Sequence, residues 1–171
     1  IAYSQSASNL SKAKTMIDVY VMNCDGSNAT RLTTDQKSYV SVWGKDGKDV
    51  YYVSSESGSS QMYRYSLENK KSEKLTDFSM GVDAPVLSPD NQLIAFTAKV
   101  YPECGADSKA SQMADSIASN GPVQAYLADH LLYRHWTEYC AGKESHIILF
   151  DIAKKTYKDL TPGTLELPIF M

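Results

Sequence analysis

The chain is poor in cysteine. Of its 171 residues, only Cys24, Cys104 and Cys140 carry thiols. They are too few and too irregularly spaced for a disulfide scaffold or for a zinc site built on CxxC pairs. One of the three must stay unpaired within the chain, and the count leaves the redox compartment open.

Long hydrophobic runs and clustered positive charge are also missing. The longest apolar stretches, such as IILF at 147–150, are far shorter than the roughly 20 residues of a membrane-spanning helix. The 17 lysines and arginines are scattered, and the net charge is -3. We therefore expect no membrane span, and the charge pattern argues against nucleic acid as a partner.

The sequence has no nucleophile elbow. A serine hydrolase with a Ser-His-Asp triad places its serine in G-x-S-x-G, at a turn between a strand and a helix. The nearest match, Gly58-Ser59-Ser60-Gln61-Met62, lacks the closing glycine and falls between two expected strands. No catalytic residue is predicted in this chain.

What the chain does contain is a repeated strand pattern. Three short alternating segments are related to one another, namely IAYSQS (1–6), VYYVSS (50–55) and IAFTAK (94–99). A further strand follows each, at DVYVMN (18–23), QMYRYS (61–66) and HIILFD (146–151). A triplet ending in Leu-Thr begins 13 residues after the start of each of these: RLT, KLT or DLT. Such constant spacing indicates an internal repeat.

Another strand precedes two of the copies. VSVWGKDGKDVYY (40–52) and APVLSPDNQLIAF (84–96) align without gaps at an offset of 44 residues. Their centres, Lys45-Asp46-Gly47 and Pro89-Asp90-Asn91, contain residues that tolerate positive φ or favour turns, which predicts tight hairpins. The repeating unit thus has four strands.

Four short strands at this period are typical of β-propeller blades. We predict an all-β fold, a β-propeller fragment of about three blades of four antiparallel strands with one short helical insertion. The expected parts are an incomplete blade (1–33), a full blade (39–77), a full blade with an insertion at about 100–130 (83–162), and the start of the next blade (164–171). A closed ring needs about four to eight blades, so we expect a piece of a longer protein.

The insertion interrupts the third copy of the repeat. From Ile94 to His146 is 52 residues, whereas the equivalent step from Val50 to Gln61 is 11. Within it, an amphipathic helix is predicted to begin at Asp107 or Ser108 and to end at Asn-Gly-Pro (120–122). Its apolar face consists of Ala110, Met113, Ala114, Ile117 and Ala118. Residues 131–139 are then expected to return as a strand and to pair with 145–151 as a hairpin.

The segments around the insertion resemble a known family. VYPECGAD (100–107), GPVQAYLADHLLYRHWTEY (121–139) and GKESHIILFDIAKKTYKDLTPG (142–163) resemble the propeller of prolyl-oligopeptidase-family serine peptidases, especially dipeptidyl aminopeptidase/acylaminoacyl peptidases. The WGKDGK and SPDNQ turns are common to TolB-like propellers. The resemblance implies a partner, a C-terminal α/β-hydrolase domain of the same polypeptide, together with short peptide substrates and a periplasmic or secreted location.

The same resemblance implies substrate-binding residues. In such enzymes the propeller limits access by folded proteins and often holds the amino terminus of the peptide. Arg134 and Glu138 could bind a substrate carbonyl or amino terminus, with Tyr133, His135 and Trp136 beside them. A structural salt bridge is the alternative for Arg134 and Glu138, and packing is the alternative for Tyr133 and Trp136. At the level of the whole chain, the alternative is a TolB-like periplasmic protein-binding propeller without enzymatic activity.

Neither a metal nor a cofactor is predicted. His130, His135, His146 and Cys140 match no standard spacing of zinc ligands. Cys104 and Cys140 flank the insertion and could form a disulfide in an oxidising compartment, or both could remain free thiols.

Overall fold

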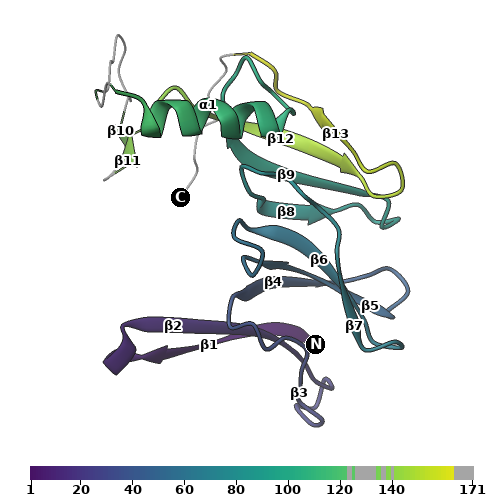
Figure 1. Cartoon of the computed structure of the whole chain (residues 1–171). Coiled ribbons are helices and arrows are strands. Elements are labelled where there is room, and N and C mark those ends of the chain that lie inside the picture. Colours follow the sequence, from purple (N-terminus) through teal and green to yellow (C-terminus); the bar gives the residue numbers. More distant parts are fainter. Residues whose placement is uncertain (123–124, 126–133, 136–137, 140, 164–171) are drawn as a thin grey trace.

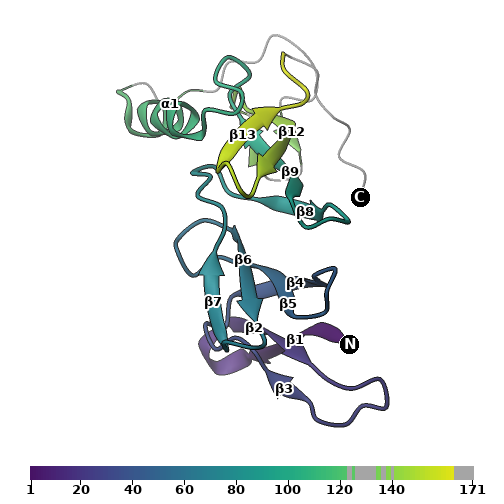
Figure 2. The same ribbon diagram turned by 90° about the vertical axis from the view of Figure 1, so that its right-hand side faces the viewer.

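The protein consists of three antiparallel sheets that follow one another along the chain (Figures 1 and 2). The computed structural model describes residues 1–122, 125, 134–135, 138–139 and 141–163. The first blade contains β1 (Ala2–Asn9), β2 (Lys14–Val21) and β3 (Thr30–Arg31). The second contains β4 (Ser38–Trp43), β5 (Asp49–Ser54), β6 (Gln61–Ser66) and β7 (Lys71–Lys74). The third contains β8 (Asp83–Leu87), β9 (Leu93–Val100), β12 (Glu144–Asp151) and β13 (Thr156–Asp159). The predicted all-β blade architecture is confirmed.

Tight hairpins join the first two strands of the full blades, as the sequence predicts. The backbone N–H of Gly44 donates to the carbonyl of Asp49 over 2.9 Å, and the same bond recurs 44 residues later over 2.9 Å. Gly47 and Asn91 occupy equivalent positions with φ of +69° and +59°. Glycine and asparagine tolerate this left-handed region better than other residues, so the turn chemistry sets the register of both hairpins.

A repeated hydrogen bond explains the constant spacing of the Leu-Thr triplets. The threonine hydroxyl of each triplet accepts a hydrogen bond from a backbone N–H of the strand that precedes it in its blade, which is β2, β6 or β12. The pairs are Thr33 with Val19 (3.0 Å), Thr76 with Met62 (2.9 Å) and Thr161 with Ile147 (2.9 Å). The hydroxyl satisfies a backbone donor just where the fourth strand ends, and a buried donor left unpaired would be costly. We call this contact the strand-end clamp.

The largest core lies between the second and third blades and is rich in aromatic rings. Phe78, which is fully buried, meets Phe96 and Tyr157 edge to face, with ring centroids 5.3 and 5.2 Å apart. Tyr157 also stacks on Phe150 at 4.7 Å. These rings come from the third blade and from the connection that precedes it, and Val53 and Met62 of the second blade belong to the same cluster, so the two sheets share one hydrophobic interior.

A second core joins the first blade to the second. Val19 and Val50 are fully buried there, beside Tyr52 and Tyr63, whose rings stack at 5.5 Å. The connection between the two blades adds a backbone bond, in which the N–H of Ile17 donates to the carbonyl of Gln36 over 3.1 Å. Neighbouring blades are therefore held both by side-chain packing and by the chain that links them.

The insertion leaves the third blade after β9 and returns at β12, so it spans 101–143. Its helix α1 (Ser108–Asn120) begins as predicted, because Asp107 caps it by accepting from the N–H of Ala110 over 3.0 Å. Gly121 follows its last turn. None of the helices in the described part of the chain has the length and apolar character needed to cross a bilayer.

The apolar face of α1 does not pack on the blade. Met113 is 67% exposed and Ile117 64%. The buried helical residues are instead Ser108 and Ser111. Their hydroxyls accept from the backbone N–H groups of Ser79 (3.1 Å) and Tyr101 (3.3 Å). Polar contacts, rather than the apolar face, attach the helix to the rest of the molecule.

The expected hairpin between 131–139 and 145–151 is wrong. The register of β12 runs from Glu144 opposite Val100 to Asp151 opposite Leu93 on β9, and β13 occupies its other edge. The described residues of the segment 131–139 pair with each other and not with β12: β10 (Arg134–His135) pairs with β11 (Glu138–Tyr139) in a separate small ladder.

Candidate functional site

The predicted substrate-binding residues fall on the small hairpin of the insertion. Its register sets Arg134 opposite Tyr139 and His135 opposite Glu138. Tyr133 and Trp136 lie outside the described residues. The fold thus brings Arg134, His135 and Glu138 together on two short paired strands, as backbone neighbours.

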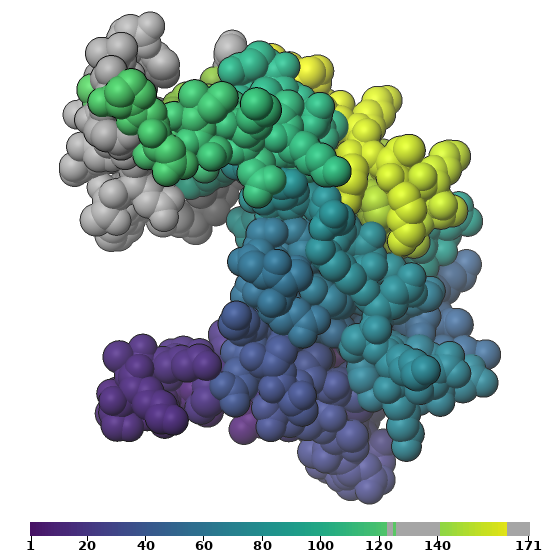
Figure 3. All heavy atoms as spheres, viewed as in Figure 1, coloured from purple at the N-terminus to yellow at the C-terminus, as the bar shows by residue number. Residues whose placement is uncertain are grey.

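The β1–β2 connection of the first blade and the β9–β12 connection of the third open on one face of the molecule (Figure 1). The β1–β2 connection carries the turn at Leu10, which is 92% exposed. The β9–β12 connection is the insertion with α1. Figure 3 shows the β1–β2 hairpin (purple) and α1 (green) projecting on the same side, with the surface hollowed between them. The candidate hairpin β10–β11 is drawn at this same end in Figure 1.

Polar contacts hold the insertion at its root. Lys143 on the returning arm forms an ion pair with Asp115 of α1 at 2.6 Å. Burial raises the pKa of Tyr101, and the neighbouring carboxylate of Asp115 raises it further. The Tyr101 hydroxyl, buried and without a hydrogen-bond partner among the described residues, therefore stays a neutral phenol at neutral pH. Neither Tyr101 nor Asp115 stood out in the sequence.

His146 is a structural residue of the third blade. It is fully buried at the start of β12, and its Nδ1 lies 2.7 Å from Oδ2 of Asp159 on β13. His130 and Cys140, the other residues weighed as zinc ligands besides His135, lie outside the described residues. Within the described part of the chain, no three potential ligand residues come together. The thiol of Cys104 is free and half-buried, and that of Cys24 is free and exposed.

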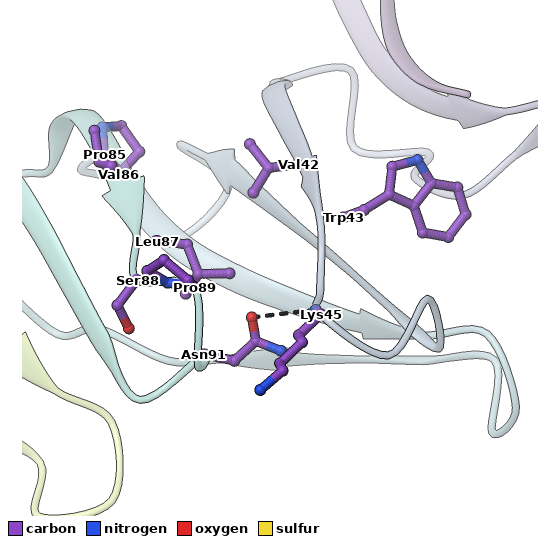
Figure 4. A pocket seen from close by; sticks show the side chains of 9 residues that line it. All are labelled: Val42, Trp43, Lys45, Pro85, Val86, Leu87, Ser88, Pro89 and Asn91. Atoms are coloured by element: carbon purple, nitrogen blue, oxygen red, sulfur yellow. Dashed lines mark hydrogen bonds between the residues drawn. The ribbon is translucent and has the colours of Figure 1, made fainter.

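A pocket of about 420 Å³ lies at the seam between the second and third blades (Figure 4). Its walls are mostly apolar, and its lining residues are Val42, Trp43, Lys45, Pro85, Val86, Leu87, Ser88, Pro89 and Asn91. The side-chain oxygen of Asn91 accepts from the N–H of Lys45 over 3.3 Å, which ties the two turns together. The pocket has one ammonium group and no pair of titratable groups, so it offers space for an apolar group rather than a catalytic site.

Sequence reasoning missed this pocket because its two walls are 44 residues apart in the chain. The aligned turns at Lys45-Asp46-Gly47 and Pro89-Asp90-Asn91 were the available signal, since equivalent turns of neighbouring blades lie side by side. The amino-acid composition gave no signal for this pocket.

Curated proteins similar to this chain include peptidases. The chain is 25% identical over 138 residues to dipeptidyl-peptidase 5 of Porphyromonas gingivalis, a match that covers 80% of the chain and 19% of that protein. It is 26% identical over 162 residues to an uncharacterised peptidase of Bacillus subtilis, YuxL, covering 94% of the chain and 24% of the relative. The chain therefore spans about a fifth to a quarter of the length of these relatives. No protein-family model matches it.

Solved structures with the same fold are propeller proteins. An acylaminoacyl peptidase of Pyrococcus horikoshii aligns with a TM-score of 0.67 at 12% identity, over 95% of this chain and 23% of that one. A protein described as TolB from Agrobacterium tumefaciens aligns with a TM-score of 0.57 at 19% identity, over 94% of this chain and 45% of that one. The chain accordingly has the fold of a portion of a β-propeller, as in the acylaminoacyl peptidase and TolB structures.

Proposed function

We propose that this chain is the non-catalytic propeller portion of a serine exopeptidase that acts on short peptides. The hydrolase active site is carried elsewhere in the full-length polypeptide, on an α/β-hydrolase domain. The observation that carries the proposal is the insertion, which interrupts one blade and presents the Arg134–Glu138 hairpin on the face where α1 and the β1–β2 hairpin project. Relatives named as peptidases support it. A periplasmic or secreted location belongs to the same proposal.

The propeller has two roles in this proposal. It gates access, because a ring of blades admits short peptides and excludes folded proteins. Its insertion also positions the substrate. Glu138 attracts the free amino terminus of a peptide, and Arg134 donates to a peptide carbonyl. A charge-assisted hydrogen bond is stronger and more directional than a neutral one, so two of them fix the scissile bond relative to a distant nucleophile.

The test uses the full-length polypeptide. A serine-directed phosphonate should label it outside residues 1–171, and dipeptide-releasing activity should be lost on labelling. Arg134→Ala and Glu138→Ala should each raise KM by about 10- to 100-fold with a smaller effect on kcat, because they remove a binding contact and no reacting group. Arg64→Ala is the matched control, since Arg64 pairs with Glu73 on the surface of the second blade. Equal effects of Arg64→Ala and Arg134→Ala would contradict substrate positioning.

A second function is a TolB-like binding propeller that docks a protein partner and catalyses nothing. The structural likeness to TolB proteins favours it. A native polypeptide too short to hold a hydrolase domain, with no phosphonate labelling and stable capture of a cell-envelope protein, would establish this function in place of the peptidase.

A further inference from the structure

The three blades carry related polar pairs at the same place. One partner begins the third-strand segment of its blade, and the other begins the Leu-Thr triplet 13 residues later. These positions hold Asp18 and Arg31, Gln61 and Lys74, and His146 and Asp159. In the second blade the two residues do not bind each other, because Lys74 binds Asp77. In the first blade Arg31 binds Asp18 at 2.5 Å, and in the third blade His146 binds Asp159 at 2.7 Å. The third blade thus reverses the order, with the acid on the outer strand.

The first and third blades differ in the burial of the outer-strand partner. Arg31 is 40% exposed and Asp159 9%, whereas Asp18 and His146 on the inner strands are both buried. Gly105, in the first turn of the insertion, covers Asp159. A Cβ atom built on Gly105 would lie only 3.0 Å from Oδ2 of Asp159, so no larger residue fits there without movement. The insertion therefore sits directly on the pair.

Both carboxylate oxygens of Asp159 have hydrogen-bond partners within the third blade. Its Oδ2 is hydrogen-bonded to Nδ1 of His146. Its Oδ1 accepts a hydrogen bond from the backbone N–H of Thr161 over 2.9 Å. Without the histidine, the carboxylate would stay buried beneath Gly105 with one oxygen unpaired. Burying an unpaired charge is far costlier than burying a paired one. The change of lowest free-energy cost is for the turn at Gly105 to move away from Asp159, so that water reaches the carboxylate.

We propose that the His146–Asp159 pair is the joint that fixes the first turn of the insertion on the third blade, beside the contacts that Ser108, Ser111 and Asp115 make. The joint determines the position of the β10–β11 hairpin relative to the third blade. It thereby controls the contact of that hairpin with substrate, and this last statement rests on the proposed function. His146 is a positioning residue in this scheme. It acts through Asp159 and Gly105 and touches no substrate.

Amide hydrogen exchange in the full-length polypeptide tests the joint without relying on activity. His146→Leu should raise exchange of the amides in 101–107 by about tenfold or more, because the root of the insertion then opens locally. His146→Gln should stay near wild type, because its amide can still donate to Asp159. Asp18→Leu is the matched control. It removes the equivalent residue of the first blade, which binds Thr33 and the N–H of Gln36, so it should raise exchange near these residues and leave 101–107 unchanged.

A second variant probes the joint from the other side. Gly105→Ala places a methyl group against Asp159 and should raise exchange in 101–107 while the strands of the third blade stay protected, even if His146→Leu fails to fold. Unchanged exchange at 101–107 in Gly105→Ala, or identical patterns in His146→Leu and Asp18→Leu, would overturn the proposal. If 101–107 respond as expected but the protein has no peptidase activity, the joint stands and the proposed function fails.

Discussion

A single hydroxyl group closes each blade at its outer end. Thr76 accepts from the N–H of Met62 over 2.9 Å and donates to Oε1 of Gln61 over 2.8 Å, while only 1% of it is exposed. The same role falls to Thr33 and Thr161 in the other blades. A methyl group of equal size could fill the space but could not pair these buried polar groups.

Thr76→Val should therefore lower the free energy of unfolding by about 1–3 kcal/mol, because it leaves the buried N–H of Met62 without an acceptor and removes one of the two hydrogen bonds to Oε1 of Gln61. Chemical denaturation followed by circular dichroism measures the change. Thr34→Val, at the exposed position that follows the equivalent Thr33 of the first blade, should change it by less than about 0.5 kcal/mol. Equal effects of the two substitutions would show that the clamp does not contribute.

Tyr52 should make the protein sensitive to alkali. Burial raises its pKa to about 12, while its hydroxyl donates to Ser72 over 2.9 Å. An unfolded tyrosine ionises near pH 10. Between these values the unfolded state loses a proton that the folded state keeps, so stability falls as pH rises above about 10.

Denaturation at several pH values between 8 and 11.5 should show that Tyr52→Phe reduces this alkaline loss. Ser72→Ala removes the same hydrogen bond but keeps the phenol, so it should retain the loss. An unchanged pH profile in Tyr52→Phe would assign the sensitivity to other groups.

At the scale of elements, residues that cap a helix or form a turn predicted the structure better than the spacing of apolar residues did. Asp107, Gly47 and Asn91 each fix their own backbone through a cap or a positive φ, and the sequence located all three. The apolar face of α1 was predicted from helical periodicity, but periodicity does not show whether such a face packs against another element. In the structure this face does not pack on the blade. The pairing of 131–139 failed for a similar reason, since which strand fills the edge of β12 depends on β9, some 50 residues earlier.

The exposed face of α1 should contribute little to folding. Replacing Met113 and Ile117 together by Ala should change the free energy of unfolding of this chain by less than about 0.5 kcal/mol, because both side chains already face solvent. Phe96→Ala, in the core between the blades, should cost about 3–5 kcal/mol. A loss above about 2 kcal/mol in the double variant would mean that the helix buries this face.

At the scale of the whole molecule, the blades were predictable from the repeat, but their contacts and the candidate site were not. Tyr157 shows why. Its ring belongs to the core shared with Phe78, and its hydroxyl accepts from the N–H of Asp77 over 2.8 Å. The two residues are 80 positions apart, and no spacing rule links them. The candidate residues on β10 and β11 came from family resemblance rather than from any periodic signal.

Tyr157→Phe should weaken the junction between the second and third blades by about 0.5–1.5 kcal/mol, the usual net value of one hydrogen bond. Thermal unfolding by calorimetry measures it. Tyr65→Phe is the control, because the Tyr65 hydroxyl makes no hydrogen bond within the described part of the chain. If both variants unfold at the same temperature as wild type, the Asp77 bond does not hold the blades together.

The insertion also affects the order in which the blades form. In the second blade, β5 and β6 are joined by residues 55–60, so they can pair as soon as both are synthesised. In the third blade, β9 must wait for β12 across residues 101–143. Closing the longer loop costs about 2 kcal/mol more in chain entropy. During synthesis the third blade is therefore the last of the three to complete its strand pairing. Until β12 pairs with it, β9 has an unpaired edge that a chaperone or another nascent chain can bind.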